Sequence, residues 1–138
     1  EVEQEQLVLL NIKKEILGGY KMEGVKSLYN KREEIIKNKL IELGFNISSI
    51  GFDYWIYAIE LKQDVIKKEG YKMSYVYNHI KNITMMCMEE RTMSSIERAL
   101  RHASITAKDN IYKVYNIPSN QNLTNKSILN LLGGEKYE

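Results

Sequence analysis

The 138-residue sequence contains a single cysteine, Cys87, and a single proline, Pro118. One cysteine allows neither an internal disulfide nor a cysteine metal cluster, so we expect the chain in a reducing compartment, the cytoplasm. No carboxylate or cysteine stands at metal-ligand spacing with both of its histidines, and no metal site is predicted. Long apolar runs are also scarce. The run "LVLL" near the start is far short of the roughly 20 residues of a membrane-spanning helix, so we expect no membrane partner.

An excess of one charge sign is also lacking, because 20 Lys and Arg oppose 18 Asp and Glu for a net charge of +2. This balance excludes a polybasic arm but leaves room for a local basic face. Hydrophobic residues make up 43% and charged residues 28%, as in one globular domain with a real core. The sequence has no phosphate-cradling glycine loop, nucleophile elbow or zinc-binding helix motif, so it predicts neither an enzyme nor a cofactor.

Apolar residues recur at helical spacing along the chain, and glycines fall at the ends of these segments. No convincing strand alternation or internal repeat is present. The sequence therefore predicts an all-α fold, a compact multi-helix domain. The expected helices cover residues 4–17, 25–43, a segment following 53, one opening at 74, one opening at 94, 111–115 and 125–132, the last with Thr124 as its cap.

The stretch "MSSIERALRHA" is the most informative part of the sequence. Ser94 followed by Glu97 has the spacing of a capping box, so we expect a helix to start at Ser94. One face of this helix is apolar and rich in small residues, which allows close approach of another helix: Ile96, Ala99, Leu100, Ala103 and Ala107. The opposite face is polar: Ser94, Glu97, Arg98, Arg101 and Lys108.

Two interpretations of this polar face arise from the residues alone. In the first, the helix is the second helix of a helix-turn-helix, and its arginines contact guanine edges or phosphates. In the second, the face is simply solvated, with Glu97 and Arg101 as a weak pair four residues apart. For an arbitrary sequence the second is the more common case.

A resemblance favours the first interpretation. "SSIERALRHA" resembles the recognition-helix segment of the DNA-binding effector domain of the sporulation master response regulator (stage 0 sporulation protein A-like). Looser similarities extend over residues 33–132 and involve the stretches "LGFNISSIGFDYWIYAI", "KKEGYKMSYVYNHI" and "LTNKSILNLL". Residues 1–30 lie outside it and are expected to be an amino-terminal helical extension or linker. Residues 31–138 would form the helix-turn-helix effector domain.

The resemblance implies a transcriptional regulator whose all-helical domain binds a double-stranded promoter element, often as a tandem dimer, here a homodimer on DNA. Its recognition helix would cover about 94–107. The base-reading positions of the family fall on Glu97, Arg98 and Arg101. The DNA-binding set that we predict from it also includes residues that would contact the backbone: Ser94, Ser95, His102 and Lys108. The acidic pocket of a phosphorylatable receiver is absent, so control by phosphorylation of this chain is not supported.

The chain also departs from the family. About five extra residues lie within "KNITMMCMEERTM", and we expect them to extend the first helix of the motif to near Met88. Glu89 and Glu90 then bring negative charge near the DNA. The methionines clustered here are expected to pack in the core, and Cys87 is expected to be buried. The stretch "IPSNQN" lacks lysines that the family uses as a DNA contact. The alternative function is a protein-interaction module on the same fold that no longer binds DNA tightly.

Overall fold

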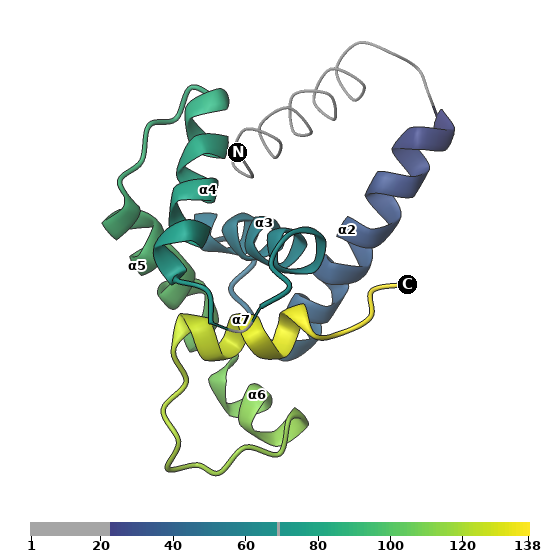
Figure 1. Cartoon of the computed structure of the whole chain (residues 1–138). Coiled ribbons are helices and arrows are strands. Elements are labelled where there is room, and N and C mark those ends of the chain that lie inside the picture. The colour runs from purple at the N-terminus through teal and green to yellow at the C-terminus, as the bar shows by residue number, and fades with distance from the viewer. Residues whose placement is uncertain (1–22, 69) are drawn as a thin grey trace.

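The computed structural model describes residues 23–68 and 70–138, with side chains described from Lys31 onward. This part of the chain is all-helical, which confirms the predicted fold class (Figure 1). The predicted helix at residues 4–17 lies outside the described residues. The helices are α2 (Glu23–Leu43), α3 (Ile50–Asp64), α4 (Met73–Met86), α5 (Met93–Ile105), α6 (Lys108–Val114) and α7 (Asn125–Gly133).

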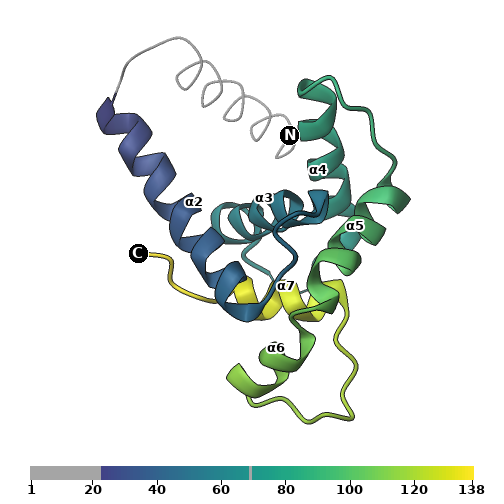
Figure 2. The same ribbon diagram turned by 180° about the vertical axis from the view of Figure 1, so that it is seen from behind.

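Helix α3 is the centre of the domain, and α2, α4, α5 and α7 pack around it (Figures 1 and 2). An amphipathic surface helix buries one stripe, whereas a central helix is apolar around most of its circumference. Helix α3 is of the second kind, because Trp55, Ile56 and Leu61, which project in three different directions, are all at most 1% exposed. The Trp55 ring meets Phe45 edge-to-face at a centroid distance of 5.7 Å. Because α3 is surrounded, the positions of all its neighbours depend on it.

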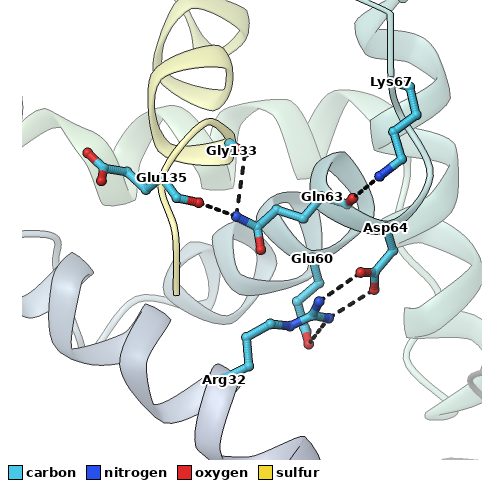
Figure 3. A network of polar contacts seen from close by, with 7 residues as sticks. All are labelled: Arg32, Glu60, Gln63, Asp64, Lys67, Gly133 and Glu135. Atoms are coloured by element: carbon cyan, nitrogen blue, oxygen red, sulfur yellow. Dashed lines mark hydrogen bonds and ion pairs between the residues drawn. The ribbon is translucent and has the colours of Figure 1, made fainter. Parts of the chain in front are cut away.

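Polar contacts join α2 and the carboxyl-terminal segment to α3 (Figure 3). Both terminal nitrogens of Arg32 donate to the Asp64 carboxylate, at 2.7 and 2.9 Å, and Nη2 lies 3.4 Å from Glu60. Planar two-point geometry of this kind is the stronger form of an arginine–carboxylate pair. From the same turn of α3, Gln63 Nε2 donates to the Glu135 carbonyl at 2.6 Å. These contacts attach the middle of α2 and the carboxyl-terminal segment to the same turn of α3.

Several helix ends lie where the local sequence predicts them. Helix α2 ends at Leu43, directly before Gly44, whose φ of 92° is the left-handed conformation that glycine adopts without steric cost. Thr124 caps α7 by accepting a hydrogen bond from the Ser127 amide at 3.1 Å. Two other helices begin at residues different from those predicted. Helix α3 begins at Ile50 rather than after Asp53, which is instead an acidic residue of its first turn, and α6 covers Lys108–Val114 rather than 111–115.

Helices α3 and α5 approach each other closely at Gly51. A Cβ atom at this position would lie 1.9 Å from the Ala99 carbonyl oxygen and 3.0 Å from the Ala103 Cβ. The small-residue face that the sequence predicts on α5 therefore does receive another helix, and the helix that it receives is α3. No helix in the described part of the chain has the length and apolar character to cross a bilayer.

Candidate nucleic-acid interface

The buried side of α5 is fixed to the core by apolar packing and by two hydrogen bonds. Ile96, Leu100 and Ala103 are fully buried. Trp55 Nε1 donates to the Leu100 carbonyl at 2.8 Å, and the Asn46 amide donates to the Ala103 carbonyl at 3.1 Å. Both bonds reach α5 from its inner side, so the orientation of the helix about its own axis is set by the core. Its opposite side is thereby held toward solvent.

The start of α5 differs from the capping-box prediction. The helix begins at Met93, and the residue that caps it is Thr92, not Ser94. Thr92 Oγ1 accepts from the Ser95 amide at 3.1 Å, and Ser95 Oγ donates to the Thr92 carbonyl at 2.9 Å. Thr92 has the extended backbone that a cap requires, and two residues later Ser94 is already helical. The amide and hydroxyl of Ser95, predicted to meet a phosphate, are engaged in this cap.

Four of the predicted residues share the solvent-facing side of α5 and are exposed: Ser94, Arg98, Arg101 and His102. Their spacing of three and four residues places them on one stripe of the helix. The stripe also contains Ile105, which is 55% exposed and was not predicted. Its position four residues after Arg101 is a signal that the sequence contains. An exposed isoleucine among polar residues adds an apolar contact point to this surface.

Glu97 lies at the edge of this stripe, toward α7. Its carboxylate is 3.8 Å from Arg101 Nη1, and both side chains are about half exposed. This is the weak pair of the simpler interpretation, and at such exposure it contributes well under about 1 kcal/mol. The Glu97 carbonyl accepts from Asn125 Nδ2 at 3.2 Å, which connects α5 to the first turn of α7. Arg101 is therefore held only loosely by Glu97 and can contact a ligand.

Lys108 does not belong to the recognition helix. Helix α5 ends at Ile105, and after Thr106 and Ala107 the chain begins α6 with Lys108. The observed helix therefore ends two residues before the predicted end at residue 107. The chain changes direction there, and Thr106 Oγ1 donates to the Gly44 carbonyl at 2.5 Å. Lys108 is nevertheless close to the stripe, because it and Arg101 line the same groove.

The connection between α4 and α5 corrects three predictions, and the first of them is the end of α4. Helix α4 ends at Met86, earlier than the predicted end near Met88. The Glu89 amide donates to the Thr84 carbonyl at 2.7 Å and the Met88 amide to the Met85 carbonyl at 3.1 Å. These are the two bonds of a Schellman motif, with Met88 in the left-handed position (φ 63°) that glycine usually takes. The sequence shows no glycine here, so the stop could not be seen.

Five of the six residues of this connection, and Met85 in the last turn of α4, are exposed rather than packed in the core. Cys87 is exposed, contrary to the prediction of a buried thiol. Met85 is 51% and Met88 94% exposed, so core packing was the wrong prediction for these two methionines. Helix α4 directs its buried side, including Val76 and Ile80, toward the core, and the connection lies beyond that contact. Glu89 and Glu90 are exposed in the same segment.

No group of three or more metal-ligating side chains is found among residues 23–68 and 70–138. The chain was compared with protein-family models, with curated proteins and with solved structures, and none of them matches.

Proposed function

We propose that the chain is a sequence-specific DNA-binding transcriptional regulator in which α4 and α5 form a helix-turn-helix. Helix α5 would enter the major groove and present Arg98 and Arg101 to base edges, while Ser94 and His102 contact the DNA backbone. Lys108 adds positive charge beside them, and a homodimer would occupy two half-sites. The proposal also draws on the resemblance of "SSIERALRHA" to the sporulation regulator's recognition segment.

One observation supports this proposal above the others: both arginines lie on the exposed stripe of a helix whose opposite side is locked into the core. A recognition helix must keep its side chains at fixed positions, because a bidentate contact with guanine tolerates little displacement. Helix α5 has 13 residues and is therefore about 20 Å long, at 1.5 Å per residue. The major groove, about 12 Å wide, admits a helix of this kind.

The test is a fluorescence-anisotropy titration against duplexes selected from a random library, at about 50 and about 200 mM salt. Arg98→Ala combined with Arg101→Ala should reduce the preference for the selected duplex over random DNA by about tenfold or more, since a guanine contact contributes about 1–3 kcal/mol of discrimination. The matched control is Lys31→Ala with Lys37→Ala. These lysines lie on α2, on the other side of α3 from α5 (Figure 1). The control should lose no discrimination.

An unchanged preference in the arginine variant, with its helical circular dichroism intact, would show that α5 is not the reading helix. The alternative would then lead, namely a protein-interaction module. A specific observation favours it: Met85, Cys87 and Met88 form an exposed apolar tip at the connection between α4 and α5. Exposed methionines are adaptable contact residues for protein partners. In that case neither variant would bind duplex with the steep salt dependence of phosphate neutralisation.

A further inference from the structure

A groove of about 310 Å³ lies beside the exposed stripe of α5. Residues from four parts of the fold line it, namely the first turns of α4, the middle of α5, the start of α6 and the turn that leads into α7. Three cationic residues line this groove: Arg101 from α5, Lys108 from α6 and Lys126 from α7. They are separated by up to 25 positions in the chain, so only the tertiary structure brings them together.

The positive charge of the groove is only partly neutralised by the protein. Glu97 is the one carboxylate in its lining, and it already pairs with Arg101. Among the described residues, the ion pairs found involve neither Lys108 nor Lys126. Lys126 Nζ lies 5.0 Å from the centre of the Tyr71 ring, a contact that leaves its charge uncompensated. Over the whole chain acidic and basic residues nearly cancel, so three cations against one carboxylate is a local concentration of charge.

The remaining lining residues suggest what accompanies an anion in the groove. Tyr77, Met73 and Leu123 supply an aromatic ring and apolar surface. The Tyr77 hydroxyl accepts a hydrogen bond from Asn125 Nδ2 at 3.3 Å. A tyrosine phenol is ordinarily protonated at neutral pH, and burial raises the pKa of Tyr77 further, so its hydroxyl can also donate a hydrogen bond. A ligand that fits these features has an anionic group at one end and a flat ring at the other.

We propose that this groove binds a phosphate ester carried on a ring-containing group, of about the size of a mononucleotide. Lys108, Lys126 and Arg101 would hold the phosphate through charge-assisted hydrogen bonds. The ring would lie against Tyr77 and Met73. Ligand sites of small molecules begin at about 300 Å³, which this groove just reaches.

Arg101 belongs both to the groove and to the stripe that contacts DNA under the proposed function, on which this part of the inference rests. A ligand that binds Arg101 in the groove makes it unavailable to DNA and so lowers the affinity for DNA. DNA that binds Arg101 lowers the affinity for the ligand by the same factor, since coupling between two sites is reciprocal. The groove would thus be a site through which a small phosphorylated compound lowers DNA affinity.

The first arm of the test records ¹H–¹⁵N chemical shifts during titration with adenosine 5′-monophosphate, and with adenosine as the probe without phosphate, at constant ionic strength. The monophosphate should give saturable shifts at groove residues, and adenosine should not. Lys108→Gln with Lys126→Gln should weaken this binding by about tenfold or more. The matched control is Lys113→Gln with Lys136→Gln, two exposed lysines outside the groove, and should bind as the unmodified chain does.

The second arm distinguishes a free phosphorylated compound from a phosphate of the DNA backbone. If DNA supplies the phosphate, the monophosphate gives no saturable shift, and the groove variant lowers the salt slope of random-duplex binding by about two relative to the control. If the two variants behave alike in both arms, the inference is wrong while the DNA-binding proposal can still stand. Saturable monophosphate binding in a chain that binds no duplex would leave the groove assignment intact and refute the DNA-binding proposal.

Discussion

We expect Gly51→Ala to reverse the usual effect of replacing glycine by alanine in a helix. The change normally stabilises a helix by about 0.5–1 kcal/mol, because alanine loses less backbone entropy on folding. At Gly51, in the first turn of α3, the added methyl group would lie 1.9 Å from the Ala99 carbonyl oxygen and 2.6 Å from its carbonyl carbon. Both atoms belong to the backbone of α5, so no side-chain rotation can relieve the clash.

The geometry sets the size of the expected effect. An ordinary contact of a Cβ atom begins at 3.4 Å, so α3 and α5 would have to separate by roughly 1.5 Å at this point. Overpacking of this kind costs about 1–3 kcal/mol, more than the helix gains from alanine. The separation would also strain the bond from Trp55 Nε1 to the Leu100 carbonyl, which sets the orientation of α5. We therefore expect a lower free energy of unfolding and a weaker preference for specific DNA.

Urea unfolding followed by circular dichroism measures the first effect, and the anisotropy titration measures the second. Gly70→Ala is the matched control, since a Cβ at Gly70 has no neighbour within 4 Å, and it should change the unfolding free energy by less than about 0.5 kcal/mol. A Gly51→Ala chain as stable as the original would mean that α3 and α5 are not in contact at this residue, and the anchoring of α5 would have to be reconsidered.

Three further predictions concern stability. Thr92→Ala should cost about 1 kcal/mol in urea unfolding, because it removes the acceptor of the Ser95 amide, while Ser94→Ala should change little; the reverse order would restore the capping box at Ser94. Met88→Gly should stabilise the chain by up to about 1 kcal/mol, as it relieves a side chain in the left-handed conformation, and a loss of stability would contradict the Schellman assignment. Burial raises the pKa of Tyr57 and Tyr71 from 10.0 to about 12. Between pH 10 and about pH 12 these two phenols stay protonated in the folded chain but ionise in the unfolded chain, so a rise in pH favours unfolding. Their contribution to the free energy of unfolding should therefore be intact below pH 10 and lost as the pH rises through about 12. Tyrosinate absorbance measured beside unfolding at each pH checks this, and ionisation of both phenols near pH 10 in the folded chain would refute it.

The sequence determined the features that depend on a few neighbouring residues. Gly44 ends α2 because a left-handed residue is needed there, and Thr124 caps α7 because its side chain reaches an amide three residues later. The division of α5 into an apolar side and an arginine side follows from spacing along one helix. The start of α5 was ambiguous, since Thr92 and Ser94 can both cap a helix. The backbone direction of the six-residue connection selects Thr92.

Only the tertiary structure decided which residues of different helices contact each other. Leu100 and Trp55 are 45 positions apart, and their hydrogen bond depends on where α3 crosses α5. Met88 and Cys87 are apolar by composition, but burial requires a neighbouring element, and none in the described chain covers this connection. Lys126 joins Arg101 and Lys108 because Asn125 attaches the first turn of α7 to α5. Helix periodicity encodes which side of each helix is apolar. Contacts between residues of different helices depend on how several helices pack at once, and no local sequence pattern contains that information.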